Sequence, residues 1–213
     1  MIKCISIDGV DGSGKTTLVN ELSKYYNTIQ VPRYYFGGMV PTDSKERTIW
    51  FRTEDAVKTT DIYISGQKIR YLLAKEFKKG FHYKAFDGKK TSLVVIDRGE
   101  LSLKAFAYAA LKKGTKWSSD EIKNYFETKF DSEFEREMGD IIDYSFLLFK
   151  ENTINTLLSR RFFDSEDMLL ATYQQEYYEK CTINNNKVKT ISPSESKERI
   201  LEIVISTIMD IGV

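Results

Sequence analysis

The segment Gly9-Val10-Asp11-Gly12-Ser13-Gly14-Lys15-Thr16-Thr17 decides the fold, because it fits the G-x-x-x-x-G-K-[ST] pattern of a phosphate-binding loop, or P-loop. Residues 2–8 before it form an apolar, β-branched run that is typical of a buried strand. Residues 17–26 after it carry apolar side chains at helical spacing. A chance match to the pattern would lack this order of strand, glycine-rich turn and helix, which is the context that binds phosphate.

The residue types of this loop predict ATP binding. Glycines allow backbone angles that turn successive N–H groups towards an anion, and the following helix adds its positive N-terminal end. Lys15 supplies a charge for the β- and γ-phosphates, and the Thr16 hydroxyl is placed to ligate Mg²⁺. We therefore expect an ATP-binding site formed by Gly9, Asp11, Gly12, Ser13, Gly14, Lys15, Thr16 and Thr17.

A second informative segment is Leu93-Val94-Val95-Ile96-Asp97-Arg98. Four apolar residues followed by an aspartate predict a buried parallel strand that ends in a carboxylate. In P-loop proteins such a carboxylate helps to hold Mg²⁺, so we expect Asp97 to be a metal ligand together with Thr16. Arg98 should face the same site, because a planar guanidinium suits phosphate oxygens.

The whole chain alternates strand and helix patterns. Strands are expected near residues 28–31, 142–149 and 187–191 in addition to the two already described. Helices are expected within residues 45–80, after Arg98, from a capping box at Ser118 and Glu121, through residues 169–180, and from Ser194 onwards. This order predicts an α/β fold: a P-loop NTPase-type parallel five-stranded sheet with helices on both faces and a short lid. We expect one domain over residues 1–213, with the lid at about 160–167 and an exposed insertion at about 80–91.

Composition excludes some partners. The 213 residues carry a formal net charge of +1, which gives no long-range field for nucleic acid. No apolar run is long enough to cross a membrane, and no signal-peptide pattern is present, so we expect a cytoplasmic protein. Cys4 and Cys181 lack metal-type spacing, and His82, the only histidine, has no partner motif and is expected in a loop.

Two motifs make the chain resemble the thymidylate kinase family. Asp8-Gly9-Val10-Asp11-Gly12-Ser13-Gly14-Lys15-Thr16-Thr17 is similar to E-G-x-D-G-x-G-K-[ST]-T, with Asp8 in place of Glu. Asp97-Arg98-Gly99-Glu100-Leu101-Ser102-Leu103-Lys104-Ala105-Phe106 is similar to D-R-Y-x-x-S-x-x-A-Y, which is more selective than the P-loop. The resemblance covers most of the chain, including Pro32-Arg33, residues 142–149 and Ile191-Ser192-Pro193-Ser194.

The resemblance implies roles for individual residues. Asp11 would contact the 3′-hydroxyl of an acceptor nucleotide, Arg33 and Arg98 would hold its 5′-phosphate, and Asp97 would organise Mg²⁺. For Arg33 a solvated surface arginine is the alternative, and for the pair Arg160-Arg161 a solvated helix end is the alternative. The remaining implied roles are transition-state cations from the lid (Arg160 or Arg161), contact with adenine (Ser192, Pro193), recognition of the acceptor base (Gln67 or Arg70) and further substrate contacts (Ser102, Phe106). A homodimer is also implied.

Several departures from the family pattern leave the acceptor base open. Gly99 stands where the family has Tyr, Phe106-Ala107 stands for a Tyr-Gln pair, and the lid lacks its usual D-R-x-E form. The helix arginine that reads the thymine edge aligns only loosely with Gln67 or Arg70, and Gln can also make two hydrogen bonds to a base edge.

The resulting hypothesis is an ATP- and Mg²⁺-dependent nucleoside monophosphate kinase of nucleotide biosynthesis, with dTMP as its acceptor. The first alternative is a deoxynucleoside kinase acting on the 5′-hydroxyl, with Asp8 as a candidate carboxylate base. The second is a nucleotide-binding regulator without catalysis, suggested by the altered lid and Gly99. A GTPase is disfavoured because the N-K-x-D guanine motif is absent.

Overall fold

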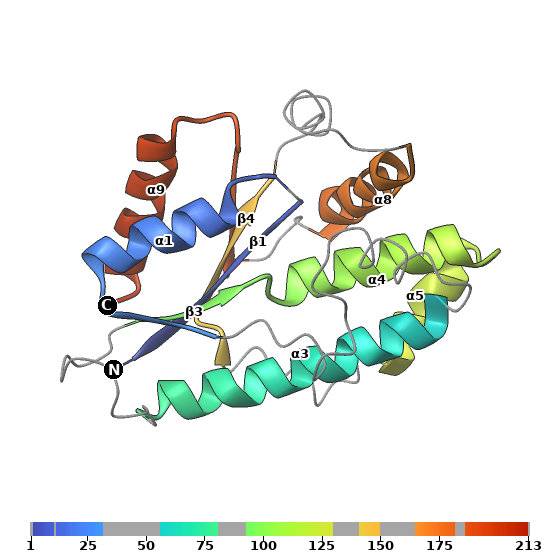
Figure 1. Ribbon diagram of the computed structural model, residues 1–213, viewed down its shortest axis with the longest axis horizontal. Coiled ribbons are helices and arrows are strands. Elements are labelled where there is room, and N and C mark those ends of the chain that lie inside the picture. The colour runs from blue at the N-terminus through green and yellow to red at the C-terminus, as the bar shows by residue number, and fades with distance from the viewer. Residues whose placement is uncertain are drawn as a thin grey trace.

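The computed structural model describes residues 2–10, 12–31, 56–80, 93–129, 141–149, 165–181 and 186–212. Within them, all five strands pair in parallel in the order β2-β3-β1-β4-β5 (Figure 1). The strands are β1 (Lys3–Gly9), β2 (Thr28–Gln30), β3 (Leu93–Asp97), β4 (Tyr144–Leu148) and β5 (Val188–Ile191). The expected five-stranded parallel sheet is therefore confirmed.

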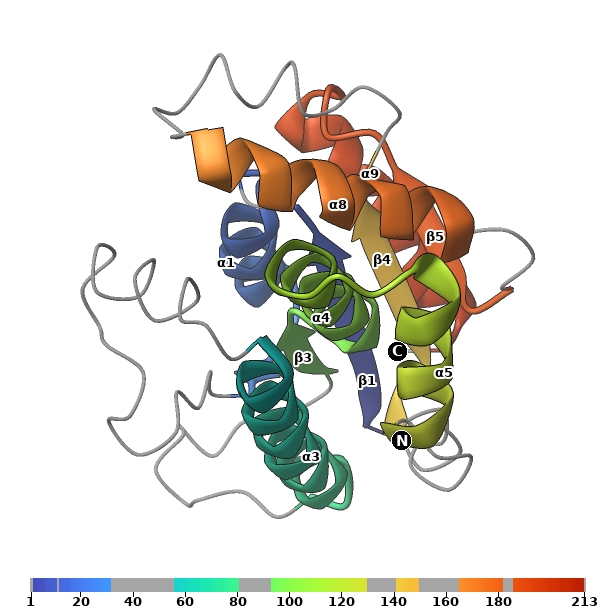
Figure 2. The same cartoon turned by 90° about the vertical axis from the view of Figure 1, so that its right-hand side faces the viewer.

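Helices cover both faces of this sheet, as expected. α1 (Lys15–Tyr25) and α9 (Lys197–Asp210) lie on one face. The opposite face carries α3 (Ala56–Lys78), α4 (Glu100–Gly114) and α8 (Ser165–Cys181), with α4 between α3 and α8 (Figure 2). α5 (Ser119–Lys129) packs against α4, where Ile122 meets Tyr108 and Leu111. None of the described helices combines the length and the apolar content that crossing a membrane requires.

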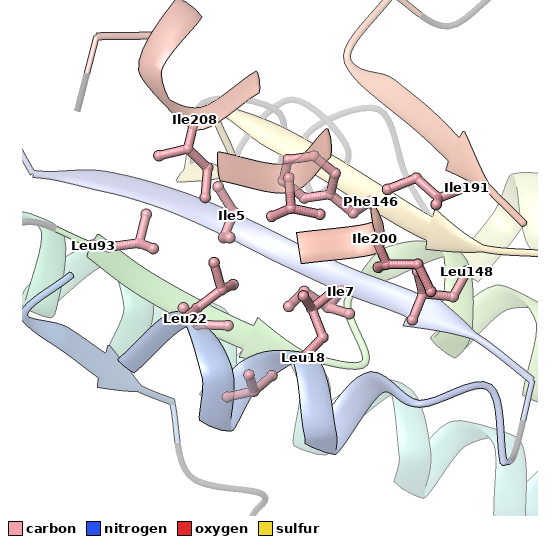
Figure 3. Close-up of a cluster of buried hydrophobic side chains, with 13 residues drawn as sticks. Ile5, Ile7, Leu18, Leu22, Leu93, Phe146, Leu148, Ile191, Ile200 and Ile208 are labelled. Atoms are coloured by element: carbon pink, nitrogen blue, oxygen red, sulfur yellow. The ribbon is translucent and has the colours of Figure 1, made fainter. Parts of the chain in front are cut away.

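The largest apolar cluster lies between the sheet and the α1–α9 layer (Figure 3). Ile5 and Ile7 point from β1 into this cluster, where they meet Leu18 and Leu22 of α1 and side chains of α9. Full burial of each such side chain stabilises the fold by about 1.5–3 kcal/mol relative to leaving it exposed. This packing fixes α1, and with it the P-loop, against the carboxyl end of β1.

Strand alternation sends the other β1 side chains to the opposite face. Because successive residues of a strand point to opposite sides, Cys4, Ser6 and Asp8 face the α3–α4 layer. Cys4 accordingly belongs to a second apolar cluster with residues of α3 and α4. The two faces of β1 therefore differ in character near its end: Ile7 is apolar, whereas Ser6 and Asp8 are buried polar residues.

Two helix starts test the expected caps. The capping box is confirmed: the Ser118 backbone N–H donates to the Glu121 carboxylate (2.6 Å), and the Glu121 N–H donates to Ser118 Oγ (3.3 Å). The expected start at Ser194 is wrong. Its N–H donates to Ser192 Oγ in a turn, and the helix begins at Lys197 with Ser196 as the cap. The Ser196 Oγ accepts the backbone N–H of Arg199.

Several expectations fall on residues outside the described ranges. They are the helical stretch at residues 45–55, the loop 81–91 with His82, and lid residues 160–164. Residues 165–167 of the expected lid lie in α8.

Candidate active site

The P-loop adopts the backbone geometry that its glycines permit. Gly9 has φ +137°, and a Cβ there would lie 2.5 Å from the carbonyl oxygen of Leu148 on β4, so only glycine fits. Gly14 has φ +92° and is the N-cap of α1. The positive end of α1 and the N–H groups of its first turn therefore lie at the loop, as anion binding requires.

Lys15 is held against this loop. Its side chain is buried, and Nζ donates to the Val10 carbonyl at 2.6 Å and to Ser13 Oγ at 3.3 Å. A phosphate oxygen is a stronger partner for an ammonium group than either of these neutral acceptors. The adjacent Thr16 and Thr17 are exposed in the first turn of α1. Lys15 and Thr16 thus lie where contact with phosphate and metal is expected of them.

Asp97 ends β3 on the α1 side of the sheet. It pairs in register with Ile7, whose side chain packs against α1, and register partners point to the same face. Its side chain is fully buried. A hydroxyl on α1 and a carboxylate on the same face form an all-oxygen donor set, which suits Mg²⁺ with phosphate and water as its other ligands. Among the described residues, no group of three or more His, Cys, Asp or Glu offers a site of another kind.

Arg98 follows directly in an unusual conformation. Its φ is +67°, the left-handed region that costs a non-glycine residue about 1–2 kcal/mol. The Arg98 N–H donates to the Ile7 carbonyl at 2.9 Å. The guanidinium lies over the Phe106 ring, 5.1 Å from its centroid. The turn therefore directs Arg98 to α4, and Phe106 supports its side chain there.

Gln67 and Arg70 of α3 hold this same turn. Arg70 donates from Nη2 to the Asp97 carbonyl (2.7 Å) and from Nη1 to the Arg98 carbonyl (2.9 Å). Gln67 Nε2 also donates to the Arg98 carbonyl (3.0 Å), and its Oε1 accepts from Arg70 Nη1 (2.8 Å). Both side chains are buried, with 3% and 6% of their surface exposed. These four hydrogen bonds thus join the two side chains to each other and to the backbone carbonyls of the turn.

Asp8 caps α4 from a different element. Its Oδ1 accepts the backbone N–H of Ser102 in the first turn of α4 (2.8 Å), and its Oδ2 accepts from Ser6 Oγ (2.7 Å). Gly99, the N-cap residue of α4, has no side chain that could do this. Complete burial raises the pKa of the Asp8 carboxyl, and the hydrogen bonds from Ser6 and Ser102 only partly oppose this.

Gly99 is required by the same arrangement. A Cβ at this position would lie 2.5 Å from the Ser6 Cβ and 2.8 Å from its Oγ. The tyrosine that the family pattern has after Asp-Arg therefore does not fit beside Ser6. The sequence showed that Gly99 replaces this tyrosine. It did not reveal that Ser6 requires the glycine or that Asp8 caps α4. The available signal was a helix start without a capping side chain, next to a strand that ends in Ser-x-Asp.

Ser192 and Pro193 lie at the same edge of the sheet. Gly9 of β1 is in register with Leu148 of β4, which is in register with Ile191 of β5. The turn after Ile191 therefore lies at the carboxyl end of β5, which is separated from β1 and the P-loop by one strand, β4. Both residues are half-buried there. Carboxyl ends of parallel strands are the usual place for ligand binding in open α/β sheets.

The structure thus brings together most of the expected site residues. At one edge of the sheet it places the P-loop, Lys15, Thr16, Asp97, Arg98, Ser102, Phe106, Gln67, Arg70, Ser192 and Pro193. Asp11, Arg33, Arg160 and Arg161 lie outside the described residues, so the roles expected of them stay predictions.

Solved structures that resemble this chain include a deoxyadenosine kinase and a thymidylate kinase. Deoxyadenosine kinase from M. mycoides with bound dATP matches with a TM-score of 0.61 and 14% sequence identity, over 96% of this chain and 98% of that chain. Thymidylate kinase from Candida albicans matches with a TM-score of 0.58 and 12% identity, over 98% and 92%. No family model matches the sequence, and no curated protein matches it.

The chain therefore has the fold of the P-loop nucleoside and nucleotide kinases, as the sequence predicted. Within this class, a deoxyadenosine kinase and a thymidylate kinase are similar to it to nearly the same degree. Identities of 12–14% show the fold alone and do not select one of the two kinds of kinase.

Proposed function

We propose that this protein is a kinase that transfers the γ-phosphoryl group of ATP to a deoxynucleoside monophosphate. The observation that carries the proposal is the meeting of the P-loop, Asp97 and Arg98 at one edge of the sheet. The first two elements suit ATP with its metal. Arg98 adds a guanidinium, which lies over the Phe106 ring, and a guanidinium suits an acceptor that already carries a phosphate.

Positioning and electrostatics supply the catalysis that such a reaction needs. The P-loop N–H groups and Lys15 bind the β- and γ-phosphates, and Arg98, with Arg33, holds the acceptor phosphate in line. Thr16 and Asp97 would hold Mg²⁺, which neutralises charge on the phosphate oxygens when bound. Arg160 and Arg161 are proposed to close over the transferring group and to exclude water, which limits hydrolysis of ATP.

The acceptor base is proposed from the resemblance alone. The sequence is similar to thymidylate kinases, so dTMP is the first candidate, with dTDP as the product. Ser192 and Pro193 are proposed to lie against adenine of the donor. Asp11 is proposed to bind the 3′-hydroxyl of the acceptor, and Ser102 and Phe106 to complete the acceptor site. A cytoplasmic homodimer is part of the same proposal, and sedimentation velocity tests the oligomeric state.

A deoxynucleoside kinase is the second candidate, and it is favoured by the similarity to deoxyadenosine kinase. That reaction uses a carboxylate to take the proton of the 5′-hydroxyl, and Asp8 was its candidate base. Against this role, both Asp8 oxygens accept hydrogen bonds inside the protein, and the side chain is fully buried against α4. A base that must reach a substrate hydroxyl would have to give up the cap of α4.

One assay separates these candidates. ADP release is measured with ATP and Mg²⁺ against dTMP, dUMP, dCMP, dGMP, dAMP and the matching nucleosides. Selective turnover of dTMP is expected. Turnover of another monophosphate would support the same reaction with a different acceptor base. Turnover of nucleosides without turnover of monophosphates would overturn the proposal.

The same assay tests a non-catalytic role. Changing Arg160 and Arg161 together to alanine should lower turnover by about 10²–10³-fold, because transition-state cations are lost, and leave ATP affinity unchanged. ATP binding without turnover of any acceptor by the wild type would instead support a nucleotide-binding regulator.

A further inference from the structure

Gln67 and Arg70 lie on α3 and reach the site from there. The resemblance implies that one of them recognises the acceptor base. The structure gives their polar atoms different partners. Three hydrogen bonds of 2.7–3.0 Å run from the two side chains to the carbonyl oxygens of Asp97 and Arg98. A fourth, of 2.8 Å, joins the two side chains to each other.

The residue that receives most of these bonds is the one with the unusual backbone. Arg98 has φ +67°, and a non-glycine residue keeps such a conformation only where its surroundings determine it. Its N–H is fixed by the Ile7 carbonyl, and its own carbonyl is fixed by Gln67 and Arg70. Both ends of the residue are therefore held, one by β1 and one by α3.

From these contacts we infer that Gln67 and Arg70 are positioning residues, which hold Arg98 in its left-handed conformation so that its guanidinium meets the acceptor phosphate. This inference rests on the proposed function, because it assigns that phosphate to Arg98. A residue that holds the phosphate-binding turn acts on every acceptor alike. A residue that reads the base changes the ratio between acceptors.

The spacing of the two residues suits this task. Gln67 and Arg70 are three positions apart in α3, so they lie on one side of the helix. That side is buried, whereas Ile69 between them is 49% exposed. The planar guanidinium of Arg70 reaches two successive carbonyls at once, and the Lys ammonium, a point charge, does not reproduce this fork. Arg70→Lys is therefore an informative conservative change.

The first test compares Arg70→Lys and Gln67→Glu with the wild type on the panel of deoxynucleoside monophosphates. Gln67→Glu can still accept from Arg70 but cannot donate to the Arg98 carbonyl. We expect kcat/KM to fall about 10- to 100-fold for every acceptor, with ratios between acceptors kept within about twofold. ATP affinity should be unchanged. Ile69→Gln, a change on the exposed side of the same helix, is the matched control and should match the wild type.

The second test does not depend on turnover. Amide hydrogen exchange at Arg98, whose N–H is bonded to Ile7, should be at least about tenfold faster in both variants, because the turn loses its support. Unchanged exchange, or a variant that changes the preference between bases, would overturn the inference. Faster exchange in a protein that phosphorylates no nucleotide would keep the positioning role and refute the proposed function.

Should both variants fail to fold, the wild type still gives an answer. The Gln67 side-chain amide and Arg70 guanidinium resonances are followed by NMR while dTMP or dCMP is added. Shifts that are the same for both nucleotides support positioning. Shifts that depend on the base show direct reading and contradict it.

Discussion

Two carboxylates, Asp8 and Glu176, are each held by several hydrogen bonds, yet their pKa values move in opposite directions. Asp8 is fully buried at the carboxyl end of β1, and burial raises its pKa. Glu176 on α8 keeps 30% of its side chain exposed, and its pKa is lowered to about 2. Burial and partners both differ: Asp8 is fully buried and its hydrogen bonds come from neutral donors, whereas Glu176 is partly exposed and two of its hydrogen bonds come from lysines.

The Glu176 cluster joins α8 to α4. Glu176 accepts from Lys112 and Tyr108 of α4 and from Lys180 of α8. Partial burial alone would raise its pKa, but the hydrogen bonds from Lys112, Lys180 and Tyr108 outweigh it. Lys112 also lies over the Tyr173 ring, 4.8 Å from its centroid. Such charge-assisted contacts stabilise the packing of two helices.

The comparison shows that similar polar clusters serve different ends. The ionised form of Asp8 is disfavoured by its surroundings. The carboxylate therefore positions the start of α4 through Ser102, at a cost in stability. The ionised form of Glu176 is favoured, so that cluster adds stability. Changes near Asp8 should therefore affect activity most, and changes near Glu176 should affect stability with little effect on activity.

Gly99→Ala should have the largest effect. Its φ is −83°, so backbone strain is not the cause, but the new Cβ would lie 2.5 Å from the Ser6 Cβ. Overpacking of this kind costs about 1–3 kcal/mol, and the shift of the Arg98 turn should lower kcat/KM by about 100-fold. Thermal unfolding and the kinase assay measure both. Ser6→Gly removes the opposing Cβ but also a hydrogen bond to Asp8, so the effect of Gly99→Ala is measured in both backgrounds. Gly99→Ala should cost less in the Ser6→Gly background than in the wild type, and an equal cost would refute this contact.

The next largest effect separates Asp8→Ala from Asp8→Asn. Alanine leaves the Ser102 N–H without its acceptor, which should cost about 1–3 kcal/mol and about tenfold in kcat/KM. Asparagine keeps an acceptor for Ser102. It can also donate to Ser6 Oγ, which has Ser145 Oγ at 2.8 Å as its own acceptor. Activity of Asp8→Asn within about threefold of the wild type is expected. A loss of about 10²–10⁴-fold would identify Asp8 as the general base instead.

The difference in stability between the wild type and Asp8→Asn should depend on pH. Because the pKa of Asp8 is raised in the folded protein, wild-type stability from this group is complete at acid pH and falls as pH rises through the folded pKa. Asp8→Asn does not titrate, so its stability relative to the wild type should increase from pH 4 upwards. Urea midpoints at several pH values measure this, and a constant difference would contradict the raised pKa.

Much of the fold was predictable because its signals are local. The glycine loop, the apolar run before Asp97 and the capping box at Ser118 each determine structure within a few residues. The parallel sheet followed from alternation of strand and helix patterns. The start of α9 was placed wrongly at Ser194, since Ser192, Ser194 and Ser196 are all capping types and only the backbone turn selects the last.

The site was less predictable because its supports come from distant parts of the chain. Gln67 or Arg70 was expected to recognise the acceptor base, and a sequence does not show that their partners include the carbonyls of residues 97 and 98. Asp8 was read as a candidate base, and its cap on Ser102 spans 94 positions. Long-range hydrogen bonds to backbone leave no periodic pattern, so only the fold reveals them.

Glu176→Gln should lower stability at neutral pH by about 1–2 kcal/mol, after allowance for solvent screening. The pKa of Glu176 is depressed from 4.5 to about 2, so its contribution is complete above pH 4.5 and is lost as pH falls through 2. The difference from the wild type should therefore shrink to about half or less by pH 3. Urea unfolding at pH 7 and pH 3 measures it. Glu202→Gln, in an exposed pair with Arg199, is the control and should be neutral at both pH values.

Lys180→Gln should have the smallest effect. Its side chain is 58% exposed, and its bond to Glu176 is an i,i+4 pair within α8, so its loss should cost no more than about 0.5 kcal/mol. Lys112→Gln should cost more, because this side chain is 26% exposed and also lies over the Tyr173 ring of α8, across the helix interface. Urea unfolding of both variants checks the order. Equal losses would mean that the contact of Lys112 with α8 adds no stability beyond that of the exposed Lys180 pair.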